Sequence, residues 1–222
     1  MEGHDYWQSF LPPGRSPGEA YGNAFPASLA DGRRLMLPIR ALGDTGSGLA
    51  SLIINQASFT VMRALADDLA QRLAALKPEI VVGMPTLGLT LAAAVGEALG
   101  HARYVPLGNS RKFWYQERLS LPVQSITTPG AGKRLYIDPR MLPLIAGKRI
   151  VLVDDVISSG QSIVAGLALL DLCGVRPIAV GAAMLQTDRA ADALGAAGWS
   201  GPVHTCLKTP MLRRGNDGLW RA

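Results

Sequence analysis

Two adjacent carboxylates, Asp154 and Asp155, are separated by two apolar residues from a turn of small and hydroxyl-bearing residues. That turn consists of Ser158, Ser159, Gly160, Gln161 and Ser162. The apolar run 150–153 before the carboxylates is typical of a strand buried on both faces of a parallel sheet. An apolar-periodic segment after the turn predicts a helix ending at Gly174. Such a strand, turn and helix form an anion site, because free backbone N–H groups and the positive helix end face the ligand.

The acidic pair at the edge of this anion site narrows the choice of ligand. Carboxylates accept hydrogen bonds from hydroxyl groups and are ligands of Mg²⁺, directly or through water. The segment therefore predicts a ligand with a phosphate at one end and hydroxyl groups or bound Mg²⁺ at the other. The alternative is a simple turn between strand and helix whose Asp pair only caps the helix and contacts solvent. The agreement of strand, acid pair, turn and helix in order and spacing favours the anion site.

Alternating strand and helix patterns place this segment in an α/β fold with a doubly wound, mostly parallel sheet. Buried strands are predicted at residues 80–83, 104–107, 135–137, 150–153, 176–185 and 202–207. A first helix is capped by Asn55 or Ser58 and ends before Pro78. Its core-facing residues are Phe59, Met62, Leu65, Leu69, Leu73 and Leu76. Further helices are predicted up to Gly100, up to Gly174 and over residues 188–194.

The start of the chain is less regular. Residues 1–32 are rich in Gly, Pro, Ser and aromatic residues without a clear period, which is typical of an irregular arm. Residues 33–40 predict a short strand, and Pro38 favours an edge position because proline cannot donate a backbone hydrogen bond. Residues 49–54 are a second candidate strand. These segments predict a small, partly β lobe.

Composition limits the class of protein. With 222 residues, 48% of them hydrophobic, the chain can bury one sizeable core. The net charge of +5 suits a polyanionic small molecule, and nucleic acid is a less favoured partner because the basic residues are spread along the chain. Two isolated cysteines indicate a reducing cytoplasm. No signal pattern and no membrane-length apolar run is found.

Two further loops follow predicted strands. Residues 84–88 form a turn that contains Thr86 and Leu87. Residues 108–132 have no period and no long apolar run, which is typical of a lid or a disordered link. That segment opens with Arg111 and Lys112, followed by Phe113, Trp114 and Tyr115. Ligands of open α/β sheets bind at the carboxyl ends of the strands. These loops are therefore expected to form one site with the acidic segment, residues 154–162.

Positions 151–162 resemble the 5-phosphoribosyl pyrophosphate (PRPP) motif of the type I phosphoribosyltransferases, with Gln161 as the least usual member. The resemblance implies an enzyme that uses Mg²⁺ to transfer phosphoribose from PRPP to a nitrogenous base, with release of pyrophosphate. It implies that Asp154 and Asp155 hold the ribose hydroxyls, and Mg²⁺ through those hydroxyls or water. The turn 158–162 is then expected to wrap the 5′-phosphate.

The other loops extend the resemblance. Residues 85–88 look like the family's pyrophosphate loop, although Leu87 stands about where a cation is often found. The pair Arg111-Lys112 is similar to the pair that opens the mobile loop of adenine and xanthine phosphoribosyltransferases, which implies that it stabilises the departing pyrophosphate together with Thr86.

Ser158 bears on the choice of base. Family members that act on hypoxanthine, guanine or xanthine commonly have an Asp there, and a serine lacks the basicity to handle a proton of the purine ring. An adenine-like or orotate-like base is therefore expected. The resemblance is closest to the adenine enzymes.

The resemblance divides the chain into an arm with part of a base-selecting hood at residues 1–54, a PRPP-binding core at residues 55–207, and a tail at residues 208–222 that is a further candidate for the hood. A cytoplasmic homodimer is expected. The alternative function is a non-catalytic PRPP-binding regulator of transcription, or an RNA binder, of the same fold. The basic pI near 9.5 and Leu87 favour this alternative, whereas the Arg111-Lys112 pair favours the enzyme.

Overall fold

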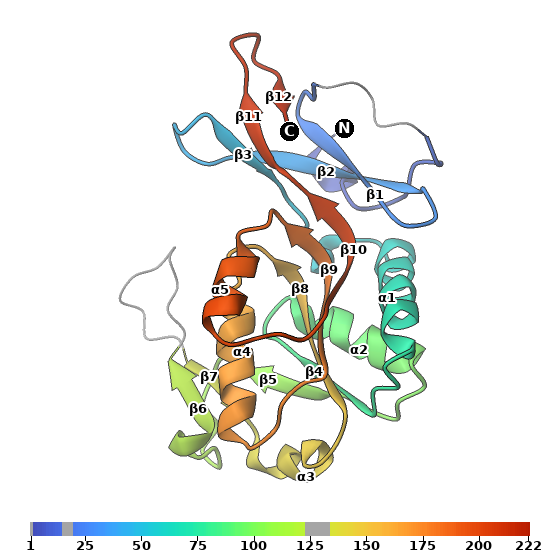
Figure 1. Ribbon diagram of the computed structural model, residues 1–222. Helices are drawn as coiled ribbons and strands as arrows, with labels where there is room; N and C mark the ends of the chain where they lie inside the picture. Colours follow the sequence, from blue (N-terminus) through green and yellow to red (C-terminus); the bar gives the residue numbers. More distant parts are fainter. Residues whose placement is uncertain (1, 15–19, 123–133) are drawn as a thin grey trace.

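The computed structural model of the chain describes residues 2–14, 20–122 and 134–222. In these ranges the chain forms a seven-stranded sheet with helices on both faces and a five-stranded sheet at one end of it (Figure 1). This arrangement confirms the predicted α/β class. None of the helices in the same ranges has the length and apolar character needed to cross a membrane.

The larger sheet has the strand order β10-β9-β8-β4-β5-β7-β6. Its strands are β4 (Ile80–Gly83), β5 (Val105–Gly108), β6 (Ser120–Pro122), β7 (Arg134–Ile137), β8 (Ile150–Ile157), β9 (Ala179–Gln186) and β10 (Val203–Thr209). The strands from β10 to β5 are parallel, whereas β7 is antiparallel to β5 and β6 is antiparallel to β7. The sheet is therefore mostly parallel, as predicted, with an antiparallel edge.

Helices lie on both faces of this sheet. The helices are α1 (Phe59–Ala74), α2 (Gly88–Ala98), α3 (Leu142–Ile145), α4 (Gln161–Leu172) and α5 (Ala190–Ala196), with 3-10 helices at Gly3–Asp5, Ile54–Gln56, Glu117–Leu119 and Pro139–Met141. Val151 and Val153 of β8 belong to the buried cluster that contains α1 and α2. Ile150 and Leu152 belong to the cluster that contains α4. Because β8 is covered on both faces, its first half is apolar at every position.

The smaller sheet brings the two ends of the chain together. Its order is β1-β2-β3-β11-β12, and neighbouring strands are antiparallel. The strands are β1 (Ala24–Ser28), β2 (Arg34–Ala41), β3 (Ser47–Ala50), β11 (Met211–Arg214) and β12 (Trp220–Arg221). The arrowheads of β8, β9 and β10 point toward this sheet (Figure 1). Gln186 at the end of β9 donates a hydrogen bond from Nε2 to the carbonyl oxygen of Ala50 over 2.6 Å. The smaller sheet is therefore attached at the carboxyl edge of the larger one.

Several local predictions are wrong in the segments that build the smaller sheet. β2 is not an edge strand, because it lies between β1 and β3. Its residues up to Pro38 pair with β1 and its residues from Ile39 onward pair with β3, so the proline lies where the pairing changes sides. β1 forms inside the arm that was expected to be irregular, and β3 ends at Ala50, well before the expected position 54. Pairing between distant segments, which no local pattern reports, stabilises these short strands.

The first helix begins as predicted, at the second of its two candidate caps. The backbone N–H of Val61 donates to Ser58 Oγ over 3.2 Å, and Ser58 Oγ donates to the carbonyl oxygen of Gln8 over 2.7 Å. Ser58 thus connects the N-terminal arm to α1. Phe59, expected to face the core, is 77% exposed, because the buried face of α1 begins at Val61 and continues through Leu65, Leu69 and Leu73.

Ser58→Ala should lower the free energy of unfolding by about 1 kcal/mol, since it removes a helix cap and the bond to Gln8. Chemical denaturation followed by circular dichroism measures this change. Thr60→Ala is the matched control, because Thr60 is exposed in the same helical turn and alanine has the higher helix propensity. An equal loss in both variants would contradict the capping role.

Candidate active site

The acidic pair lies where two parallel strands separate. β4 pairs with β8 up to Gly83 opposite Val153, and the N–H of Met84 donates to the carbonyl oxygen of Val153 over 2.8 Å. β8 continues beside β9 to Ile157, so Asp154 and Asp155 lie within a strand, whereas the sequence placed them just after one. From β4 the chain passes through α2 to β5, which lies in the same sheet on the side of β4 away from β8, whereas β9 lies on the side of β8 away from β4. This separation is the switch point at which doubly wound sheets bind ligands.

Asp154 is almost fully buried against the start of α2. It is 5% exposed, and a Cβ added to Gly88 would lie 2.6 Å from Asp154 Oδ1 and 2.8 Å from its Cα. Only glycine permits so close an approach. The backbone N–H of Asp155 donates to Asp154 Oδ1 over 2.9 Å.

Burial raises the pKa of the Asp154 carboxyl well above its ordinary value, and the neighbouring charge of Asp155 raises it further. Burial also raises the pKa of Asp155. Within the described residues no Lys, Arg or His forms an ion pair with either carboxylate. The pair is therefore costly to ionise without a ligand, and hydroxyl donors or a cation would lower that cost.

The turn 158–162 leads directly into α4. Gly160 precedes the helix with φ +81°, a conformation that favours glycine, and a Cβ there would lie 3.2 Å from the Cβ of Ala193 in α5. Gln161 and Ser162 are exposed, and Ser158 and Ser159 are half-buried. The first N–H groups of α4 lack partners within the helix, so they are available to an anion, and anion binding by the turn stays a prediction.

The loop between β4 and α2 lies beside the acidic pair. The peptide bond between Pro85 and Thr86 is cis. Thr86 is exposed, and its Oγ1 accepts a hydrogen bond from Asn109 Nδ2 over 3.1 Å. The Leu87 side chain packs against the buried cluster of α1 and α2, so its backbone is the part that can face a ligand.

The segment expected to be a lid has more structure than its sequence indicates. Its described part contains the 3-10 helix Glu117–Leu119 and β6, so the prediction of a structureless stretch is wrong there. Residues 123–132 lie outside the described residues. Arg111 pairs with Glu117 over 3.4 Å. In the described chain neither Arg111 nor Lys112 bonds to the acidic segment.

Trp114 and Tyr115 of this segment contact the antiparallel edge of the sheet, whereas Phe113 is 95% exposed. Trp114 Nε1 donates to Asp138 Oδ2 over 3.1 Å, and Arg140 lies 4.7 Å above the Trp114 ring. The ring of Tyr115 lies 5.9 Å from that of Tyr136. Hydrogen bonds from Arg140 hold the pKa of Asp138 well below its usual range. These contacts hold Trp114 and Tyr115 against β7 and the turn after it.

Two residues at the carboxyl ends of the parallel strands were missed by the sequence analysis. Asn109 positions Thr86, and Arg189 donates from Nη2 to Ser158 Oγ over 3.0 Å. Both follow the ends of parallel strands, β5 and β9. The rule that singled out the other loops could therefore have found them.

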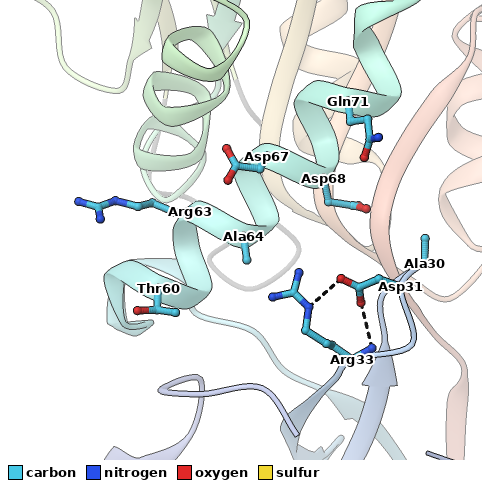
Figure 2. A pocket seen from close by; sticks show the side chains of 9 residues that line it. All are labelled: Ala30, Asp31, Arg33, Thr60, Arg63, Ala64, Asp67, Asp68 and Gln71. Carbon is cyan, nitrogen blue, oxygen red and sulfur yellow. Dashed lines mark hydrogen bonds and ion pairs between the residues drawn. The ribbon is translucent and has the colours of Figure 1, made fainter. Parts of the chain in front are cut away.

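A cavity of about 630 Å³ lies away from these loops, between α1 and the turn from β1 to β2 (Figure 2). Asp31 in its lining accepts hydrogen bonds from Arg33, and Asp68 pairs with Arg72. Its lining shares no residue with the acidic segment or the turn. The candidate site remains the switch point of the sheet, at the carboxyl ends of its parallel strands.

The fold and this site define a class of protein, and comparison with known families identifies it. Residues 49–195 match the phosphoribosyl transferase domain, and this match covers more than half of the chain. The chain therefore belongs to the phosphoribosyl transferase domain family. Membership supports PRPP-dependent transfer of a phosphoribosyl group to a base over the alternative of a non-catalytic regulator. A comparison with curated sequences finds no match.

Solved structures show the same fold. The chain is similar to adenine phosphoribosyltransferase from Trypanosoma brucei, in complex with AMP, pyrophosphate and ribose-5-phosphate, with 19% identity, TM-score 0.57, and coverage of 86% of this chain and 75% of that one. It is also similar to the Giardia lamblia enzyme complexed with 9-deazaadenine, with 17% identity, TM-score 0.60, and coverage of 77% of this chain and 93% of that one. The enzyme from Thermoanaerobacter pseudethanolicus is similar at 17% identity and TM-score 0.60, with coverage of 78% of this chain and 95% of that one. At these identities the likeness concerns the fold.

Gly88→Ala should lower the free energy of unfolding by about 1–3 kcal/mol, because the new methyl group would overlap the backbone of Asp154. Gly96→Ala is the matched control in the same helix, since its nearest new contact is 3.7 Å. That change should raise stability by about 0.5–1 kcal/mol. Urea denaturation compares the two, and stabilisation by both would contradict the close approach of α2 to Asp154.

Asp154→Asn should stabilise the ligand-free protein at neutral pH. Because the folded-state pKa of Asp154 is raised above 3.8, the folded chain binds more protons than the unfolded chain above that pH. The contribution of Asp154 to the free energy of unfolding is therefore present at low pH and is lost as pH rises through the raised pKa. Thermal unfolding should show a gain in Tm for Asp154→Asn that grows as pH rises above about 4. Asp171→Asn, which removes an exposed carboxylate of α4, is the control, and an Asp154→Asn gain that shrinks toward neutral pH would contradict the raised pKa.

Proposed function

We propose that the chain transfers the 5-phosphoribosyl group of PRPP to a nitrogenous base, with release of pyrophosphate. The observation that carries this proposal is the continuity of β8 with α4. The acidic pair, with Asp154 buried and Asp155 half-buried, is followed after two apolar residues by a turn whose Gly160 immediately precedes the N-terminus of α4. A ligand with hydroxyl groups next to a phosphate satisfies both features at once, and PRPP carries its ribose hydroxyls and 5′-phosphate in that relation.

In this proposal the acidic pair binds the ribose. Asp154 and Asp155 accept hydrogen bonds from the two ribose hydroxyls, which replace the water that burial removes. The close contact of Gly88 with Asp154 holds the carboxylate in place before the ligand arrives. The 5′-phosphate is bound by N–H groups at the start of α4 and by the hydroxyls of Ser158, Ser159 and Ser162, with Gln161 at the open side.

The same carboxylates fit Mg²⁺ in one particular mode. Among the described residues there is no cluster of three His, Cys, Asp or Glu side chains that could hold a metal alone. Mg²⁺ commonly keeps several waters and takes one or two carboxylates together with substrate oxygens. Asp154 and Asp155 would hold it in this way, through water or the ribose hydroxyls. When bound, the ion supplies positive charge to the pyrophosphate.

The remaining loop residues are proposed to act on the leaving group. The bond from ribose C1 to pyrophosphate breaks as a bond from C1 to a nitrogen of the base forms, and negative charge develops on pyrophosphate. Thr86 and the backbone of Leu87 would donate to it, with Thr86 oriented by Asn109. Arg111 and Lys112 would add charge. The Arg111–Glu117 pair is exposed on both sides, so breaking it costs little.

An adenine-like or orotate-like base is proposed, because Ser158 lacks the basicity that 6-oxopurine enzymes use. The solved structures described above are adenine phosphoribosyltransferases, which favours the first of these. The free thiols of Cys173 and Cys206 suit the cytoplasm. We expect a homodimer.

A pyrophosphate-release screen tests the reaction. With PRPP and Mg²⁺, the wild type should turn over adenine or orotate and respond little to hypoxanthine, guanine, xanthine and uracil. Lys112→Ala should lower kcat more than it weakens PRPP binding, at a cost of about 2–4 kcal/mol in the transition state, because its charge acts on the departing pyrophosphate.

Asp155→Asn should lower PRPP affinity, and Asp171→Asn is the control at the far end of α4. Strong turnover of hypoxanthine or guanine would refute the role given to Ser158. PRPP binding without pyrophosphate release from any base would instead support a regulator.

A further inference from the structure

Arg189 is a cation beside the turn 158–162 that the roles above leave unused. It lies between β9 and α5, after Thr187 and Asp188. Its Nη2 donates to Ser158 Oγ over 3.0 Å, and its Nε donates to Thr187 Oγ1 over 3.1 Å. Two neutral hydroxyls thus hold the guanidinium against the first residue of the turn.

Tight packing fixes this position. A Cβ on Gly160 would lie 3.3 Å from both the Cα and the carbonyl oxygen of Ala190, so the first turn of α5 lies directly on the turn 158–162. Arg189 immediately precedes Ala190. On its other side, the N–H of Thr187 donates to the carbonyl oxygen of Thr209 over 2.8 Å. The backbone on both sides of Arg189 is therefore held in place, which keeps its side chain within reach of the turn.

The charge of Arg189 is available to a ligand. In the described part of the chain no carboxylate forms an ion pair with Arg189, whereas Arg111 pairs with Glu117 and Arg176 pairs with Asp171. The hydroxyl partners of Arg189 neutralise no charge, and the side chain is exposed. A guanidinium held in this way can still direct N–H groups at an oxyanion.

We propose that Arg189 is a phosphate-binding residue of this site, whose guanidinium contacts the 5′-phosphate held by the turn 158–162. The inference rests on the proposed function and adds to it a cation that selects 5-phosphorylated ribose. It also gives Ser158 a second meaning. An Asp at that position would pair with Arg189 and remove its charge from the ligand, whereas the Ser158 hydroxyl positions Arg189 without neutralising it.

Isothermal titration calorimetry of the full chain with Mg²⁺ tests this role, with ribose 5-phosphate, PRPP and pyrophosphate as probes. Arg189→Ala should weaken ribose 5-phosphate and PRPP by about 10- to 100-fold, because one charge-assisted contact to the phosphate is lost. Pyrophosphate should bind within about twofold of wild type, since it carries no 5′-phosphate. Arg189→Lys should recover part of the loss by restoring the charge. Arg176→Ala, a matched loss of an exposed arginine, should leave the affinities for all three probes unchanged.

The outcomes separate this inference from the function on which it rests. A wild type that binds neither PRPP nor ribose 5-phosphate would overturn both. Wild-type binding of PRPP with equal affinity in Arg189→Ala would overturn the inference and leave the proposed function standing. Weakening of pyrophosphate binding as large as that of ribose 5-phosphate would also overturn the inference.

Discussion

The separation of β4 from β8 beside Asp154 is the constraint on which the rest of the site depends. Hydrogen bonding between the two strands ends at Val153, and the start of α2 lies directly on the next residue of β8. Asp154 is thereby buried and Asp155 half-buried, and neither forms an ion pair with a cation of the described chain, which is unfavourable for the ligand-free fold. The two apolar clusters on either face of the sheet offset that cost. The stability of the core thus permits a binding site that is destabilising by itself.

Close contacts at two glycines fix the positions of the neighbouring loops. Gly88 brings α2 onto the acidic pair, and Gly160 brings α5 onto the turn 158–162. The contact at Gly88 leaves no room for a methyl group and the contact at Gly160 leaves little, so the loops are set by packing and do not depend on a ligand for their positions. The positions of Arg189 and Thr86 follow from this arrangement, because each residue lies next to a segment that a close glycine contact holds in place. A site built from such fixed parts loses little conformational entropy when it binds.

The smaller sheet places the two chain ends over the same edge. β3 and β11 pair directly, and Gln186 connects β3 to the end of β9. The contacts that recognise the base are therefore expected from segments far apart in sequence. In the proposed function this arrangement would separate two tasks. The continuous segment from β8 to α4 would bind the part of the ligand common to phosphoribosyl donors, and the smaller sheet would distinguish bases.

The sequence by itself determined the features whose causes are local. The apolar run 150–153, the acid pair, the turn and the apolar period after it are contiguous, so the strand, the anion site and the helix follow from neighbouring residues. Tertiary structure decided what depends on distant partners. Pro38 lies inside a sheet because β2 changes neighbours there, and Trp114 lies against β7 because Asp138 and Arg140 hold it. Arg189 reaches Ser158, 31 residues away, only because α5 packs on Gly160. No local pattern encodes such contacts, since each depends on where another element ends.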